Sequence, residues 1–66
     1  MHTEPFKISL RAARVNADMT QDDAAHALGM SKQTIVNWET GRTEPRFADV
    51  CRMAELYKIP IEMLDI

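Results

Sequence analysis

The chain has 66 residues, 45% of them hydrophobic, with only two glycines and three prolines, which predicts one small, ordered domain over residues 1–66. Eight basic and ten acidic residues give a formal net charge of −2, which excludes attachment to nucleic acid through overall charge alone. One cysteine cannot form an internal disulfide, and no apolar run could span a bilayer. Without a targeting leader, and with Met1 indicating a natural N-terminus, we expect a soluble, cytoplasmic protein.

A first helix is predicted at about residues 5–16. Pro5 suits a first helical turn, where its missing amide is not needed. Apolar residues then recur at intervals of four, three and four, at positions Phe6, Leu10, Ala13 and Ala17. No segment of the chain carries a strand or repeat signal.

Residues 20–40 predict two short helices that cross through a tight turn. Thr20 and Asp23 stand at the spacing of a capping box, so the first helix of this pair begins there and runs to about residue 28. Gly29 suits the left-handed residue that ends a helix. Ser31 then caps a helix at about 32–40, which stops at Gly41.

The second helix of this pair carries polar side chains beside its apolar face, namely Lys32, Gln33, Thr34 and Asn37. Gln33 and Asn37 lie four residues apart, and each amide can both donate to and accept from adenine, while Lys32 can donate to guanine. Alone, such a face is typical of the solvated side of an amphipathic helix. Next to a glycine turn, it predicts a surface that contacts DNA bases.

Basic residues flank this helix although the chain is acidic. Lys32 is its first residue, while Arg42 and Arg46 follow it and are candidates for contacts with phosphates. Glu39 would cancel part of this charge, so we hypothesise that Arg14 pairs with it. Trp38 lies on the same side of the helix as Ile35 and is interpreted as a core residue rather than a base-stacking platform.

The remaining chain predicts a loop and two further helical segments. A polar loop at 43–45 ends in Pro45, which prevents continuation of the preceding helix. A fourth helix of about three turns follows from the spacing of its apolar residues, which are Phe47, Val50, Cys51, Ala54 and Tyr57. Cys51 is therefore interpreted as a small core residue and not as a nucleophile. Pro60 opens a last short helical turn, after which Ile61, Met63 and Ile66 form either core or a dimer patch.

Together these residues resemble the phage-repressor-like helix-turn-helix family of the Xre or Cro type. The resemblance covers nearly the whole chain and rests on Thr20-Gln21, Ala24-Ala25, Leu28-Gly29, Ser31, Ile35, Trp38-Glu39, Gly41 and Pro45. It implies an all-α, compact, five-helix lambda-repressor-like domain with a central helix-turn-helix that binds double-stranded operator DNA, often as a homodimer.

The resemblance also implies roles for individual residues. Lys32, Gln33, Thr34 and Asn37 would face the major groove, and Gln21 would touch a phosphate or orient the helix that contacts the bases. Thr40, Arg42 and Thr43 would meet the DNA backbone. The family often pairs the residues that correspond to Arg14 and Glu39, in agreement with the charge argument.

Other chemistries find little support in the sequence. Asp22 and His26 have the spacing of two metal ligands, but no third ligand is suitably placed, so no metal is expected. No nucleophile with a base, carboxylate pair, phosphate loop or cofactor fingerprint is present, so we expect neither an enzyme nor a cofactor or small-molecule ligand.

Two functions remain. The first is a sequence-specific transcriptional regulator, a repressor of phage or plasmid type that binds an inverted-repeat operator. The alternative is a protein-interaction module of the same fold, antitoxin-like or bound by an anti-repressor, which the low net charge favours. A partner-binding helix is expected to carry apolar or aromatic anchors where this chain has Lys32 to Asn37, so DNA binding is the leading prediction.

Overall fold

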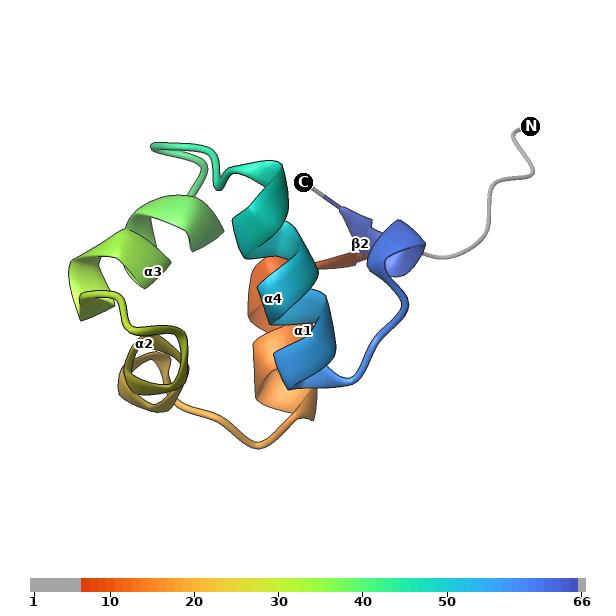
Figure 1. Ribbon diagram of the computed structural model, residues 1–66, viewed down its shortest axis with the longest axis horizontal. Helices are drawn as coiled ribbons and strands as arrows, with labels where there is room; N and C mark the ends of the chain where they lie inside the picture. Colours follow the sequence, from red (N-terminus) through yellow and green to blue (C-terminus); the bar gives the residue numbers. More distant parts are fainter. Residues whose placement is uncertain (1–6, 66) are drawn as a thin grey trace.

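The computed structural model describes residues 7–65, which are mostly helical. Four α-helices follow one another, α1 (Leu10–Asn16), α2 (Gln21–Leu28), α3 (Lys32–Glu39) and α4 (Phe47–Tyr57), and a 3-10 helix, η1 (Ile61–Met63), comes after them. Two short strands, β1 (Ile8–Ser9) and β2 (Leu64–Asp65), pair in parallel on the side of α1 and α4 away from α2 and α3 (Figure 1). The helical class is as predicted, but the five-helix count is not confirmed for the described residues.

The start of the first helix differs from the prediction of residues 5–16. Helix α1 begins at Leu10, because the Ser9 hydroxyl accepts a hydrogen bond from the amide of Ala12 at 3.0 Å and caps it. The extended backbone before Leu10 pairs Ile8 with Leu64, so the prediction of no strand is wrong here. Strands of two residues are too short to show the alternating pattern that identifies a strand. Pro5 and Phe6, on which the prediction relied, lie outside the described residues.

Both caps and the glycine turn of the helix-turn-helix are confirmed. The Thr20 hydroxyl accepts from the amide of Asp23 at 3.0 Å, and the Asp23 carboxylate accepts from the amide of Thr20 at 2.9 Å. The latter bond lowers the pKa of the Asp23 carboxyl below its ordinary value. Gly29 ends α2 with a φ of 69°, in the left-handed region, and the Ser31 hydroxyl caps α3 by accepting from the amide of Thr34 at 3.2 Å.

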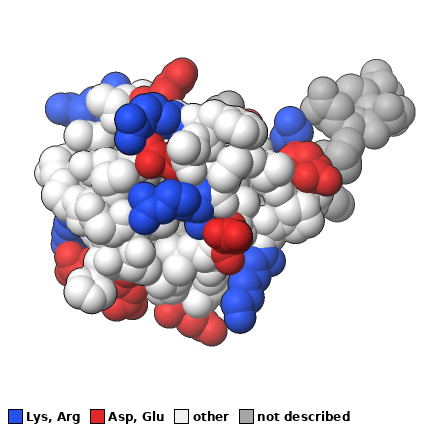
Figure 2. Space-filling model, in the orientation of Figure 1, with Lys and Arg blue, Asp and Glu red and all other residues white. Residues whose placement is uncertain are grey.

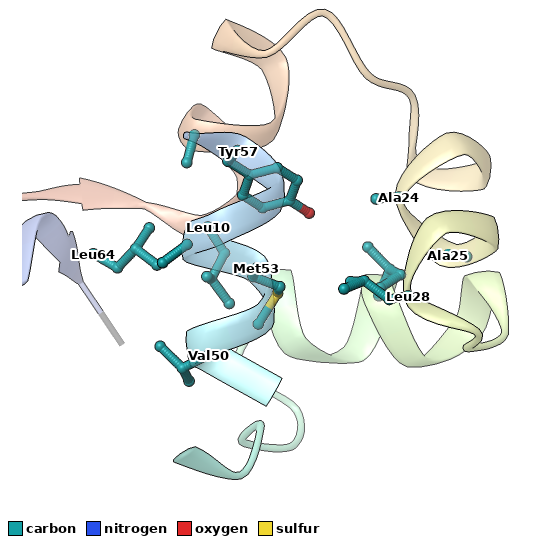
Figure 3. Packing of buried hydrophobic residues seen from close by; sticks show 11 residues of the cluster. Leu10, Ala24, Ala25, Leu28, Val50, Met53, Tyr57 and Leu64 are labelled. Carbon is teal, nitrogen blue, oxygen red and sulfur yellow. The ribbon is translucent and has the colours of Figure 1, made fainter. Parts of the chain in front are cut away.

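The core lies where the four α-helices meet, and β2 adds one residue to it. Its buried apolar residues are Leu10, Ala13, Ala24, Ala25, Leu28, Ile35, Val50, Met53, Ala54, Tyr57 and Leu64. Figure 3 shows Tyr57 and Met53 of α4 between Leu10 on one side and the labelled residues of α2 on the other. Trp38 is half-buried and packs against this cluster, in agreement with its interpretation as a core residue.

Helix α4 presents a different face to the core from the one predicted. Phe47 is 74% exposed and Cys51 is also exposed, so their assignment to the apolar face is wrong. The buried residues of this helix, besides the ion-paired Asp49, are Val50, Met53, Ala54 and Tyr57. This set has the same i, i+3, i+4, i+7 spacing as the predicted one but starts one turn later, and spacing alone does not distinguish the two.

Candidate nucleic-acid interface

Helix α3 is oriented by the residues that it buries. Ile35 is 1% exposed at the centre of the inward face. At about 100° per residue, Gln33 and Asn37 point about 160° and 200° away from Ile35, so they lie on the outward face. Lys32 and Thr34 belong to the first turn and point to its two flanks. The four predicted base-contacting residues therefore lie together on the exposed side and the N-terminal end of α3.

The two amides on the outward face bind each other. The Gln33 side-chain nitrogen donates to the Asn37 side-chain oxygen at 3.0 Å. This bond leaves the Gln33 oxygen as an acceptor and keeps N–H donors on both side chains, the combination that an adenine edge requires. It also restricts the rotamers of both side chains, so less conformational entropy is lost when a ligand binds.

Lys32 and Thr34 already have polar partners. The Lys32 ammonium lies 4.0 Å from the Asp22 carboxylate, but both side chains are more than half exposed, so this ion pair contributes little stability. The Thr34 hydroxyl lies 2.9 Å from the Ser31 hydroxyl, so Thr34 takes part in the cap of α3. Of these two, Lys32 is the one free to turn toward another partner.

A buried ion pair fixes α3 to α1. Arg14 donates to both carboxylate oxygens of Glu39, with its Nε at 2.6 Å and its Nη2 at 3.1 Å. The side chains are 8% and 3% exposed, and the hydrogen bond to Glu39 raises the pKa of Arg14 above its ordinary value. A further Arg14 nitrogen donates to the Met19 carbonyl at 2.7 Å. The structure thus contains the pair expected on charge grounds, and it neutralises Glu39 next to the interface.

Gln21 joins this pair from the first turn of α2. Its side-chain nitrogen donates to a Glu39 oxygen at 3.1 Å. The resemblance offered two roles for Gln21, contact with a phosphate or orientation of α3, and this hydrogen bond is the contact that the second role requires. Helices α1, α2 and α3 therefore share one buried polar cluster.

The candidate phosphate contacts surround the end of α3 and the loop after it. The Thr40 hydroxyl donates to the Val36 carbonyl at 2.9 Å, so its proton is used within the helix. Arg42 and Thr43 are exposed, and in the described chain no carboxylate pairs with Arg42. Arg46 is 82% exposed and lies 3.4 Å from the Asp49 carboxylate. Arg42 is thus the least engaged cation of the loop.

The surface of the molecule carries charges of both signs. Figure 2 shows basic and acidic side chains interspersed over the visible face rather than gathered into a field of one sign. Among the residues assigned to DNA contact, Lys32, Arg42 and Arg46 carry positive charge. Three cations give this surface only a moderate attraction for phosphates.

One side chain that supports the helix-turn-helix carries no local signal in the sequence. Arg52 of α4 donates to the carbonyl of Leu28 at 2.8 Å and so satisfies an acceptor at the end of α2. The two residues are 24 positions apart, and exposed arginines are common, so neither composition nor spacing reveals this contact. Arg52 thereby fixes the end of α2 immediately before Gly29.

Within residues 7–65, no group of three or more His, Cys, Asp or Glu side chains could hold a metal ion, and His26 is exposed. None of the helices in the described chain is long and apolar enough to cross a membrane.

A family model described as "Helix-turn-helix" matches residues 10–64, which include all four α-helices. The chain belongs to this family. The similarity to phage-repressor-like proteins of the Xre or Cro type is confirmed, which makes this helix-turn-helix domain a DNA-binding regulator and not an enzyme.

Two relatives extend this comparison. The "Cryptic phage CTXphi transcriptional repressor RstR" of Vibrio cholerae is 32% identical over 59 residues, which are 89% of this chain and 53% of that protein. The "Uncharacterized HTH-type transcriptional regulator MJ0272" of Methanocaldococcus jannaschii is 34% identical over 57 residues, 86% of each chain. The helix-turn-helix chain thus spans about half the length of the first relative. No solved structure matches it.

Proposed function

We propose that the protein is a sequence-specific transcriptional repressor that places α3 in the major groove of double-stranded DNA. The observation that carries this proposal is the exposed, hydrogen-bonded amide pair of Gln33 and Asn37 on a helix whose opposite face is fixed by Ile35 and Glu39. Each base pair presents a distinct set of donors and acceptors in the major groove, so rigidly held amides can discriminate between sequences. Lys32 and Thr34 extend the same surface at the start of α3.

Selective binding by this surface requires two copies of the chain. Each bidentate contact to a base discriminates by about 1–3 kcal/mol, so two or three contacts from one α3 give limited selectivity. A homodimer on an inverted repeat doubles them, with half-sites about 34 Å apart. By occupying this operator the dimer excludes polymerase. The name of the Vibrio cholerae relative, a phage transcriptional repressor, supports the repressor role.

Phosphate contacts in this complex come from both sides of α3. Arg42, Thr43 and Arg46 are exposed in the loop or at the start of α4 and are assigned to the DNA backbone. Gln21 and Thr40 are assigned to the same role, but each side chain already donates a hydrogen bond within the protein. Arg42 is therefore proposed as the strongest of these contacts.

The alternative, a protein-interaction module, is favoured by one observation. Phe47 is 74% exposed at the start of α4, and exposed aromatic side chains are frequent anchors of protein interfaces. Phe47 is not part of α3, whose outward face carries amides and a lysine. The two functions therefore rely on different surfaces and can be separated by substitution.

The deciding experiment selects bound duplexes from a random DNA pool at low salt. Wild type is expected to enrich an inverted repeat, and the double variant Gln33→Ala/Asn37→Ala is expected to lose this preference while staying folded. Arg42→Ala should keep the preferred sequence but bind all sequences more weakly. Arg11→Ala, at an exposed position on α1, is the matched control for loss of a charge and should behave as wild type.

Two outcomes would contradict the proposal. Failure of folded wild-type protein to enrich any sequence would transfer support to the interaction module, and Phe47→Ala would then be tested for loss of a protein partner. Enrichment of the same repeat by wild type and by the double variant would show that α3 does not select the sequence.

A further inference from the structure

Val36 is an apolar residue of α3 that does not join the core. Ile35 is fully buried and Trp38 packs against the core cluster, whereas Val36 is half-buried and outside that cluster. At about 100° per residue, Val36 lies about 60° from Gln33 around the helix axis, on the outward half of α3. A β-branched apolar side chain therefore lies within an otherwise polar surface.

Val36 lines a shallow hollow on the outward side of α3. The other side chains that border this hollow are polar, namely Gln33, Asn37, Thr40 and Arg42. The Thr40 hydroxyl donates its proton to the Val36 carbonyl and not into the hollow. The hollow thus combines one apolar wall with the two hydrogen-bonded amides, and Arg42 adds a positive charge to its lining.

The major groove contains one apolar group that fits such a wall. Base edges there present nitrogen and oxygen atoms, except for the 5-methyl group of thymine. A cytosine in the same place carries only a hydrogen at C5, so Val36 would lose this apolar contact, and the cytosine amino group would stand where thymine has a carbonyl oxygen. The chemistry of the hollow therefore favours thymine over cytosine.

We infer that Val36 is a specificity-determining residue that contacts the 5-methyl group of a thymine beside the base pair bound by Gln33 and Asn37. This inference rests on the proposed function, because it requires α3 to lie in the major groove. The contact of Val36 is apolar, in addition to the polar contacts of Gln33 and Asn37. It predicts a thymine next to the base pair that these two amides bind in each half-site.

The test removes the methyl group from the DNA and the apolar wall from the protein. In the operator selected by wild type, each thymine is replaced in turn by deoxyuridine, which lacks only the methyl group, and the Kd is measured. Val36→Thr replaces one methyl group of the side chain by a hydroxyl at nearly the same shape. Val15→Thr makes the same change at a 52% exposed position on α1 and is the matched control.

At one thymine in each half-site, deoxyuridine is expected to weaken wild-type binding by about fourfold per half-site, the effect of one buried methyl group. Val36→Thr should bind thymine and deoxyuridine operators about equally, whereas Val15→Thr should discriminate as wild type does. Because the deoxyuridine comparison uses wild-type protein, it does not depend on whether Val36→Thr folds.

The results distinguish failure of the inference about Val36 from failure of the proposed function. If no deoxyuridine weakens wild-type binding, or if the loss is the same for Val36→Thr, the inference about Val36 is wrong while sequence-specific binding by α3 stands. If folded wild type selects no sequence at all, both the inference and the proposed function are wrong.

Discussion

Loss of the Glu39 carboxylate is expected to destabilise the protein by about 3–5 kcal/mol, the usual effect of leaving one charge of a buried pair without its partner. Glu39 accepts two hydrogen bonds from Arg14 and one from Gln21, and its side chain is only 3% exposed. In Glu39→Met, Arg14 keeps the Met19 carbonyl as an acceptor but no countercharge. A chain of 66 residues has about 3–10 kcal/mol of unfolding free energy, so this loss approaches the total stability.

A double-mutant cycle separates the buried charge from the lost packing. Arg14→Met should also destabilise, because it leaves the Glu39 carboxylate buried beside Gln21 alone. The double variant Arg14→Met/Glu39→Met removes both charges and keeps apolar volume, so it should recover at least half of the larger single loss. Arg11→Met, at an exposed position of the same helix, is the control and should change stability by less than about 0.5 kcal/mol.

Urea unfolding followed by circular dichroism measures each free energy, and thermal melting provides a second readout. A loss of 3 kcal/mol corresponds to a fall in Tm of about 12–24 °C for a domain of this size. If a single variant is already unfolded in buffer, the reasoning requires the double variant to fold. Additive losses, with a coupling energy below about 0.5 kcal/mol, would refute the view that an unpaired buried charge determines the cost.

Other predictions concern the backbone and the one tyrosine of the chain. Burial, with the nearby Glu39 carboxylate, raises the pKa of Tyr57 from 10.0 to about 12. Tyr57 therefore loses its proton at a lower pH in the unfolded chain than in the folded one, so the free energy of unfolding should fall as pH rises from 10 to about 12. An absorbance titration measures the pKa of Tyr57, with Tyr57→Phe as the control. Among residues 7–65 the buried Tyr57 hydroxyl has no hydrogen-bond partner, so Tyr57→Phe should not destabilise at pH 7, and a loss above about 1 kcal/mol would contradict this. Lys58 ends α4 with a φ of 57°, so Lys58→Gly should raise the unfolding free energy by up to about 1 kcal/mol in urea titrations. Gly29→Ala should lower it by about 1–2 kcal/mol through backbone strain alone, since a Cβ there meets nothing within 4 Å, and no change would contradict this.

The parts of the fold that the sequence predicted are those with local chemical causes. Thr20 and Asp23 cap each other across one turn, and Gly29 occupies a backbone conformation that other residues adopt at a cost. These signals depend on neighbours within a few positions, so one sequence suffices to recognise them. The pair of Arg14 and Glu39 is long-range, and the sequence predicts it because a carboxylate beside a helix proposed to contact DNA requires neutralisation.

The predictions that were wrong concern places where two sequence patterns favour different structures equally well. Pro5 and Ser9 both suit the start of a helix, and Ser9 is the residue that caps α1. On α4, the predicted and the observed apolar residues have the same spacing, so periodicity does not decide which set is buried. Met53 and Tyr57 pack into the core, and this orientation of the helix leaves Phe47 exposed. The pairing of β1 with β2 joins two ends of the chain and has no local signal.

The sequence predicts that Gln33 and Asn37 contact bases as two independent side chains. The structure joins them by a hydrogen bond, and it places Val36, which the sequence argument passed over, in the same hollow. A valine in a helix is normally assigned to the core, and only the burial of its neighbours shows that this one faces outward. The chemistry of the interface is therefore more apolar than its polar residues suggest.

An acidic chain can bind DNA if its carboxylates are engaged elsewhere, and here several are. Glu39 is paired with Arg14, Asp49 lies beside Arg46, and Asp23 belongs to a helix cap. If Lys32, Arg42 and Arg46 each contact a phosphate, the logarithm of the DNA association constant should fall with the logarithm of the salt concentration, with a slope of about −2.7 per protomer. Arg42→Ala should make this slope shallower by about 1. A much steeper slope would show that phosphate contacts dominate. With so few cations assigned to phosphates, the proposed preference among sequences requires base contacts on α3, and for this reason the test of its small hollow bears directly on the proposed specificity.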